Sequence, residues 1–150
     1  MQLSIKCSVA VHSLIFIHEA TGKVKVTSAL LAQSTGSNPV IIRNILSALK
    51  KAGIISVALG TGGAELAKDP KNITLYDIYH SLEPDGLSSV IGIHDCSQRA
   101  CPVAQNIAFV LKEPYNQIEE SIKATMKTIT LQYLIDRFHK KTANSTQQLK

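Results

Sequence analysis

Residues 37–68, SNPVIIRNILSALKKAGIISVALGTGGAELAK, constrain the fold more than any other stretch of this chain. Asn38 and Pro39 predict a helix start, because asparagine caps unpaired backbone N–H groups and proline fits the first helical position. Aliphatic residues then recur at helical spacing and predict a buried face: Ile42, Ile45, Leu46 and Leu49. The opposite face is polar and partly basic: Val40, Arg43, Asn44, Ser47 and Lys51.

The end of the same stretch predicts a small β-hairpin. The helix is expected to end at Gly53, and Ile55, Val57 and Leu59 alternate with smaller residues as in a strand. Residues 60–63, Gly-Thr-Gly-Gly, predict a turn that leads into a second strand. A helix followed by a two-stranded hairpin is the plan of a winged helix-turn-helix.

A shorter helix is expected just before this stretch. Thr27 is its expected N-cap, Leu30 and Leu31 form its apolar side, and residues 33–37 form a polar, glycine-containing turn. Two helices joined in this way form a helix-turn-helix, whose second helix enters the DNA major groove. A helical hairpin that binds no DNA would show the same pattern, because a fold alone does not fix a function.

The distribution of charge favours a nucleic-acid partner. Residues 1–68 hold seven lysines and arginines and two glutamates, a net charge of +5, whereas residues 69–150 hold nine basic and nine acidic residues. The whole net charge of the chain therefore lies on the half with the predicted helix-turn-helix. A polyanion binds such a module by releasing its counterions.

Length and cysteine content narrow the class of protein. A chain of 150 residues can form one domain with an accessory element, and its three cysteines do not make a disulfide framework. We therefore expect a cytoplasmic protein. Residues 7–17 are apolar but too short to span a bilayer, so no membrane partner is expected. They are predicted to belong to a first helix over residues 3–20 that ends before Gly22.

The second half predicts a connector that follows a short helix. Thr74 and Asp77 have the spacing of a capping box for a helix that ends before Pro84. Residues 85–101 then lack periodicity and predict a long loop. Another short helix is expected to begin at Pro102.

A long helix is expected to follow Pro114, over residues 115–139. It carries apolar residues on two sides, more than its own small domain can bury, which favours a partner helix and a homodimer through residues 115–139. Two-fold pairing would place two recognition helices about 34–36 Å apart on DNA.

These elements together predict a mainly α fold with a small β-hairpin. We divide the chain into a winged helix-turn-helix DNA-binding domain (1–83), a connector and cysteine-containing sensor loop (84–114), a dimerisation helix (115–139) and a disordered tail (140–150).

The order and spacing of several motifs resemble those of the Rrf2 family, bacterial winged-helix regulators that include IscR, NsrR and CymR. The motifs are Asn38-Pro39-Val40, residues 43–46, residues 49–53, residues 60–63 and residues 73–78. The resemblance extends from about residue 3 to residue 139, and Cys101-Pro102-Val103 with Asn106-Ile107 is most similar to the YwnA-like branch. It implies a cytoplasmic homodimer that binds a pseudo-palindromic operator, and we expect a repressor.

The resemblance also implies a DNA-binding surface, position by position. Thr27 and Ser28 would contact phosphates, and Thr61 and Gly62 at the wing tip would approach the minor groove or backbone. Lys50 is counted among the DNA-binding residues. The reading edge of the recognition helix would comprise Ser37, Asn38, Val40, Arg43 and Asn44. Among these, Arg43 suits guanine, Asn44 adenine and Val40 the thymine methyl group. Many relatives have an arginine near the base of the wing, where this chain has Ala58 and Leu59.

The sensor of such a regulator is the least determined part. Relatives with an iron–sulfur cluster use three cysteines in the loop before the dimerisation helix, whereas this loop has only Cys96 and Cys101. Ala104 stands three residues after the last cysteine, so no histidine ligand is present at that family position. His94 has the spacing of neither a zinc nor a cluster site. We therefore expect no metal and no cofactor, with an iron–sulfur cluster kept as the alternative.

A thiol switch is the favoured form of control. Cys101 directly precedes Pro102 at a helix N-terminus, where N–H groups and the helix dipole stabilise a thiolate, and Arg99 lies close by. Cys96 would be the resolving thiol. Cysteines with no regulatory role remain an alternative. A small-molecule pocket is another, lined by Leu87, Val90, Ile91 and Ile93, which could equally be core residues.

Two other classes of protein fit less well. An enzyme would need a nucleophile with a base, and Cys101 with His94 or His80 is the only candidate, without a supporting motif. We therefore expect no enzyme. A winged helix used for protein–protein contact differs from a DNA-binding one in its weak dependence on salt.

Overall fold

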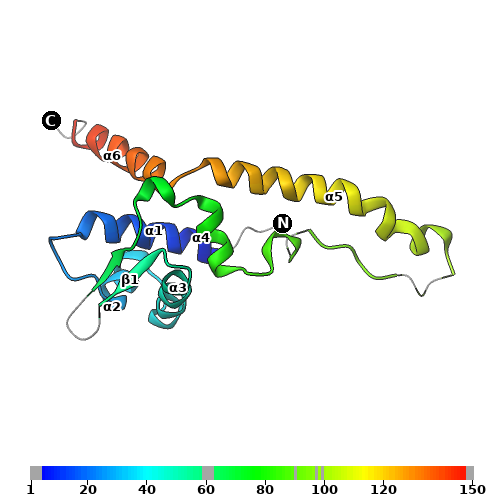
Figure 1. Ribbon diagram of the computed structural model, residues 1–150, viewed down its shortest axis with the longest axis horizontal. Helices are drawn as coiled ribbons and strands as arrows, with labels where there is room; N and C mark the ends of the chain where they lie inside the picture. Colours follow the sequence, from blue (N-terminus) through cyan, green and yellow to red (C-terminus); the bar gives the residue numbers. More distant parts are fainter. Residues whose placement is uncertain (1–4, 59–62, 90, 97, 99, 148–150) are drawn as a thin grey trace.

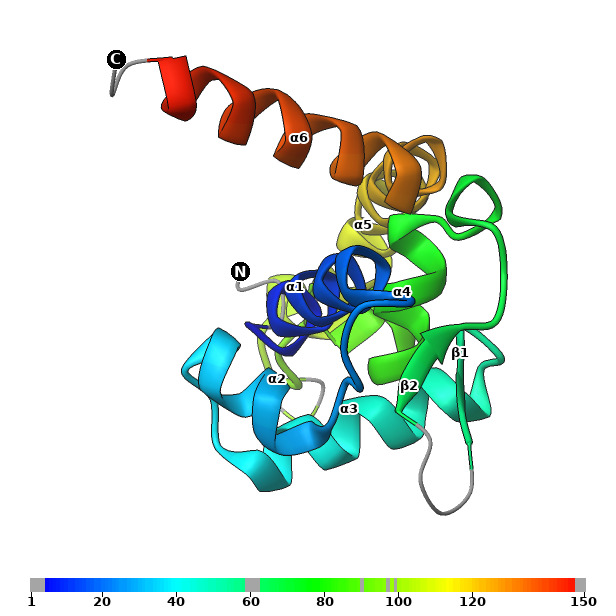
Figure 2. The same cartoon turned by 90° about the vertical axis from the view of Figure 1, so that its left-hand side faces the viewer.

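A computed structural model describes residues 5–58, 63–89, 91–96, 98 and 100–147 of the chain (Figure 1). The first helix, α1 (Ile5–Ala20), lies at the centre of the body. It buries Ala10, Leu14 and Ile17 completely and packs on α2, α3, α4 and α6. Figure 2 shows α6 above α1, and α2 and α3 below it.

The helix-turn-helix consists of α2 (Ser28–Thr35) and α3 (Pro39–Lys51), as predicted. Thr27 caps α2 by accepting a 3.2 Å hydrogen bond from the amide of Leu30. Gly36 ends α2 in the left-handed conformation, with φ of 66°, which a residue with a side chain adopts at a cost. The chain can therefore turn sharply from one helix into the next.

The wing is a two-stranded antiparallel sheet of β1 (Ile55–Val57) and β2 (Ala64–Leu66). Ile55 is paired with Leu66, and Val57 with Ala64, so that Ile55 and Ala64 both lie in the core. The predicted strand position Leu59 and the turn residues 60–62 lie outside the described residues.

Two short 3-10 helices, η1 (Pro70–Asn72) and η2 (Gly86–Ser89), flank α4 (Leu75–Leu82). The predicted capping box is present: the Thr74 hydroxyl accepts from the amide of Asp77, and the Asp77 carboxylate accepts from the amide of Thr74. Leu87 packs with Tyr79 and Met126 in a second buried cluster.

The C-terminal helices differ from the prediction. Instead of a short helix from Pro102 and a long one over 115–139, the chain forms α5 (Pro102–Thr128) and α6 (Leu131–Gln147). Pro114 lies inside α5, where it removes one helical hydrogen bond. Val110, whose carbonyl loses that donor, is exposed, so water can satisfy the carbonyl.

The break at Ile129–Thr130 has a tertiary cause. The Leu75 amide donates to the Ile129 carbonyl, and the Leu131 amide donates to the Ile73 carbonyl, each at 2.8 Å. This short bridge between Thr74 and Thr130 requires an extended backbone, so the helix cannot continue. Residues 140–147, predicted to be a disordered tail, are instead the end of α6.

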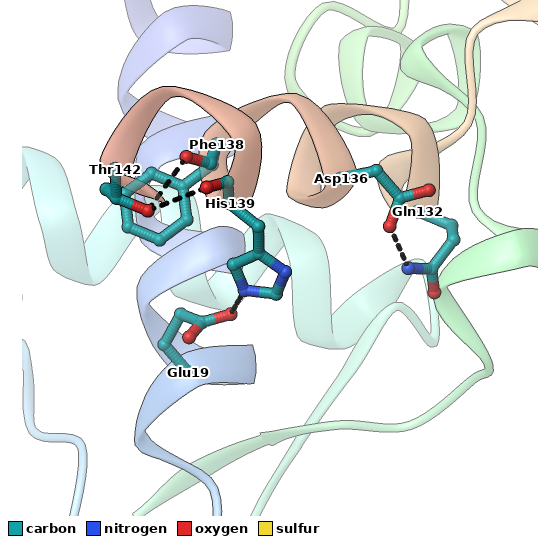
Figure 3. A network of polar contacts seen from close by, with 6 residues as sticks. All are labelled: Glu19, Gln132, Asp136, Phe138, His139 and Thr142. Carbon is teal, nitrogen blue, oxygen red and sulfur yellow. Dashed lines mark hydrogen bonds and ion pairs between the residues drawn. The ribbon is translucent and has the colours of Figure 1, made fainter. Parts of the chain in front are cut away.

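The N-terminal part of α6 belongs to the core of the winged domain. Leu131 and Ile135 are completely buried in the same cluster as Leu14, Ile42 and Ile78. Farther along, the imidazole of His139 lies 2.7 Å from the carboxylate of Glu19 and joins α6 to α1 (Figure 3). None of the helices in the described ranges is long and apolar enough to cross a membrane.

Candidate nucleic-acid interface

The N-terminal half of α3 presents the predicted reading edge. The Asn38 side chain accepts a 2.8 Å hydrogen bond from the Val40 amide and fixes the first turn. Ile42, Ile45 and Leu49 anchor the opposite face in the core, as predicted. Consequently the side chains of Asn38, Val40, Arg43 and Asn44 are exposed, and Ser37 is half-buried.

Val40 is 53% exposed, although it is apolar and lies at the start of a helix. An apolar side chain exposed at such an edge is of the kind that can contact a thymine methyl group in the major groove. The Arg43 Nε donates a 3.3 Å hydrogen bond to the Pro39 carbonyl, so the side chain follows its own helix toward the N-terminus. Arg43 therefore lies along the same edge as Val40.

A groove of about 470 Å³ separates α3 from the start of α2 and the wing. We call it the basic groove. The described residues that line it include three cations and no acidic residue: Lys25, Val26, Thr27, Ser28, Arg43, Leu46, Ser47, Lys50, Val57, Gly63 and Ala64. It brings together four of the predicted site residues, Thr27, Ser28, Arg43 and Lys50.

The other predicted DNA-binding residues lie elsewhere. Ser37, Asn38, Val40 and Asn44 do not line the basic groove but belong to the turn before α3 and to its first turns. Thr61 and Gly62 lie outside the described residues.

The wing is held against the loop before α2 by backbone contacts. The Ala64 amide donates a 3.0 Å hydrogen bond to the Val26 carbonyl. A Cβ atom on Gly63 would lie 2.7 Å from the Val26 nitrogen, closer than such atoms approach in proteins. Only glycine allows this approach, which fixes Lys25 and Thr27 beside β2.

Sequence reasoning missed Lys25 and Ser47 as residues of this groove. The sequence does place Ser47 on the same helix face as Arg43, one helical turn further on, and this shared face is the signal that marks it. No local signal indicates Lys25, because its place depends on how the wing packs against Val26.

The two cysteines predicted as sensors both lie beside the first turn of α5. The Cys96 thiol donates to the Ala104 carbonyl at 3.3 Å. Cys101 is exposed at the N-cap position, and the backbone N–H groups of Ala104 and then Val103 lower the pKa of its thiol. Arg99 lies outside the described residues. In contrast, burial in α1 raises the pKa of Cys7.

These residues do not fit an iron–sulfur cluster or another metal centre. Within the described ranges, no three His, Cys, Asp or Glu side chains are grouped as metal ligands would be. Cys7 belongs to α1, whereas Cys96 and Cys101 border α5.

The positions predicted for a small-molecule pocket are partly core. Leu87 is 2% exposed and packs on Tyr79 and Met126, while Ile91 and Ile93 are half-buried. Val90 lies outside the described residues.

Comparison with known proteins agrees with this geometry. The sequence profile of the Rrf2 family, described as an iron-dependent transcriptional regulator, matches residues 3–137. The HTH-type transcriptional regulator YwnA of Bacillus subtilis is 30% identical over 131 residues, which cover 86% of this chain and 93% of YwnA.

Two solved structures show the same fold. A transcriptional regulator from Lactobacillus plantarum is similar with a TM-score of 0.73 and 31% identity, over 97% of this chain and 99% of that one. The cysteine regulator CymR of B. subtilis is similar with a TM-score of 0.65 and 23% identity, over 91% and 97%.

Proposed function

We propose that this chain, which belongs to the Rrf2 family of transcriptional regulators, binds an operator in double-stranded DNA as a homodimer and represses transcription. The observation that carries this proposal is the combination of an exposed reading edge on α3 with the adjoining basic groove. A helix edge of this kind can enter the major groove while cations beside it bind the phosphates.

Each part of the surface has a separate task in this proposal. Arg43 donates to guanine, Asn44 pairs with adenine and Val40 covers a thymine methyl group, and a bidentate pair contributes about 1–3 kcal/mol of discrimination. Lys25 and Lys50 bind phosphates without regard to sequence. The N-terminus of α2, next to Thr27 and Ser28, binds a further phosphate through its backbone amides.

The dimer part of the proposal rests on α5. Of its 27 residues, all described, Met126 alone is buried. Apolar residues alternate at spacings of three and four along one side: Ala104, Ile107, Leu111, Pro114 and Ile118. Such a stripe is typical of a helix that packs on a second helix. We therefore move the proposed dimer surface from residues 115–139 toward the first half of α5.

Repression follows from occupancy alone, since a dimer on a promoter excludes polymerase from it. The proposed site of action is the cytoplasm, where the three cysteines stay reduced.

We also propose that peroxide weakens the binding of the protein to DNA by oxidising Cys96 and Cys101. The Cys101 thiolate attacks a peroxide oxygen; an S–O bond forms, the O–O bond breaks, and hydroxide leaves. The Cys96 thiol then attacks this sulfenic sulfur, forming a disulfide and releasing water. Two electrons pass from the thiols to the peroxide. The Cys96 hydrogen bond to Ala104 supports this pairing, because Ala104 also borders Cys101.

Fluorescence anisotropy tests the proposal. The reduced protein is titrated onto DNA from upstream of its own gene and onto a scrambled duplex, at two salt concentrations. We expect preference for the native duplex and weaker binding at high salt. Equal, salt-independent binding to both duplexes would contradict DNA recognition and favour a protein partner. A Cys96→Ser, Cys101→Ser variant that loses DNA under peroxide as the wild type does would contradict the thiol switch alone.

A further inference from the structure

We propose that Lys6, at the start of α1, binds a phosphate of the DNA strand opposite to the one held by the basic groove. We further propose that Glu83 pairs with Lys6 while DNA is absent and is displaced from it by the phosphate. This inference rests on the DNA binding proposed above and assigns a contact that lies outside the basic groove.

The exposed surface of α3 has two flanks. Residues follow one another at about 100° around a helix, so side chains three, four or seven apart point the same way. One flank lines the basic groove: Arg43, Ser47 and Lys50. The other flank lines a second, smaller hollow: Ile41, Asn44 and Ala48. Val40, on the reading edge, projects between the two flanks and away from the buried face of the helix.

The second hollow, which we call the Lys6 hollow, has a volume of about 140 Å³. Its lining joins α3 to the start of α1, through Lys6, and to the end of α4, through Leu82. Among the described residues of this lining, Lys6 alone is charged. A cation therefore lies beside the second flank of the reading edge, as Lys25 and Lys50 lie beside the first.

The shape of B-DNA gives this arrangement a meaning. The major groove is about 12 Å wide, and an α-helix with its side chains is about 10–12 Å across. A helix that fills the groove therefore brings each of its flanks close to the phosphates of a different strand. Lys25 and Lys50 would meet one strand and Lys6 the other. Phosphate contacts on both sides fix the position of a reading helix between the strands.

Glu83 is the anion that Lys6 contacts within the chain. The Lys6 Nζ lies 3.8 Å from the Glu83 Oε1, well beyond the distance of about 2.7–2.9 Å in a charge-assisted hydrogen bond. The Lys6 side chain remains 61% exposed in this pair, and such exposed pairs contribute little to stability. A phosphate can therefore take the place of the carboxylate, and Glu83 competes with DNA for Lys6.

A double-mutant cycle measured by fluorescence anisotropy tests the inference on the native and scrambled duplexes. Lys6→Gln should weaken binding to both alike and reduce the slope of log affinity against log salt by about one. Glu83→Gln should strengthen binding of the wild type and have no effect in Lys6→Gln, because it acts through Lys6. Lys6→Arg should retain the wild-type slope.

Lys140→Gln is the matched control, because it also removes an exposed positive charge. Its helix, α6, lies on the other side of α1 from α3 (Figure 2). We expect the slope and the affinity of this variant to equal those of the wild type. Thermal melts of all variants establish that they fold.

Duplexes that carry a single neutral methylphosphonate identify the strand. At the phosphate bound by Lys6, this replacement should weaken binding of the wild type but not of Lys6→Gln. A second position should behave in the same way toward Lys50→Gln. We expect the two positions to lie on opposite strands, facing each other across the major groove.

Several results would overturn the inference and leave DNA binding standing. They are a Lys6→Gln variant that binds as the wild type does while Lys50→Gln loses slope, a Glu83→Gln effect that persists without Lys6, and two coupled phosphates on the same strand. Binding of the wild type that does not depend on salt would overturn both the inference and the DNA binding on which it rests.

Discussion

Gly63 lies directly against the backbone of Val26, so closely that an added Cβ would be 2.7 Å from the Val26 nitrogen. This contact sets the position of the wing relative to the loop that precedes α2. Lys25, on that loop, and Lys50, on α3, line the basic groove on either side. The position of Lys25, which we propose to bind phosphate, therefore depends on a glycine that carries no charge.

A Gly63→Ala substitution should push the wing away from Val26. We expect a stability loss of about 1–3 kcal/mol, as for an overpacked contact, and weaker binding to both native and scrambled DNA. Urea denaturation and anisotropy measure the two effects. Gly92→Ala is the matched control, because a Cβ at Gly92 has no neighbour within 4 Å. Equal behaviour of the two variants would show that the contact is unimportant.

Two substitutions of Asn38 can distinguish its role as a helix cap from its proposed contact with DNA. Asp caps a helix as well as Asn does, so Asn38→Asp should keep the stability of the wild type, whereas Asn38→Ala should lose about 1 kcal/mol. The added carboxylate faces the proposed DNA, and Asn38→Asp should therefore bind it more weakly than Asn38→Ala. Thermal melts and anisotropy give the comparison. The opposite order of affinity would place Asn38 away from the DNA.

Leu131 tests whether α6 belongs to the core of the winged domain. Its side chain is completely buried. Leu131→Ala should destabilise the protein by about 2–5 kcal/mol, through lost burial and a cavity. Tyr133→Ala, on the exposed side of the same helix, should change stability by only about 0.5 kcal/mol. Chemical denaturation measures both, and a small effect at Leu131 would mean that α6 is dispensable to the fold.

The cysteines should differ in reactivity. Backbone N–H groups lower the pKa of Cys101, whereas burial raises the pKa of Cys7. The thiolate is the nucleophile, so iodoacetamide should modify Cys101 before Cys7 at neutral pH. The Cys101 rate should fall as the pH falls through its pKa. Peptide mass mapping over a pH series follows each site, and Cys101→Ser removes the fast phase. Faster labelling of Cys7 would contradict this account.

Local signals predicted the helix starts well. Thr27, Asn38 and Thr74 each accept a hydrogen bond from a backbone amide two or three residues further on. Both partners of each interaction therefore lie in one short segment of sequence. The buried face of α3 was predicted for the same reason, because helical spacing repeats within that segment. The roles given to the exposed residues of that helix remain predictions.

The features that the sequence did not predict depend on distant partners. The helix breaks at Ile129–Thr130 because those residues bridge to Ile73–Thr74, and no local breaker marks the place. Pro114 suggested a helix boundary. The helix continues through it because the carbonyl that loses its hydrogen bond lies on an exposed part of α5, where water can bind it. Lys25 joins the basic groove only through the packing of Gly63 on Val26.

The most direct test of the central claim is the salt dependence of DNA affinity in three variants. The account predicts that Arg43→Ala loses about 1–3 kcal/mol of its preference for the native over the scrambled duplex, because one base contact is lost while those of Asn44 and Val40 remain. Lys25→Gln and Lys50→Gln should instead weaken binding to both duplexes alike and each reduce the slope of log affinity against log salt by about one. Unchanged preference in Arg43→Ala, together with unchanged slopes in both lysine variants, would contradict the assignment of this surface to DNA.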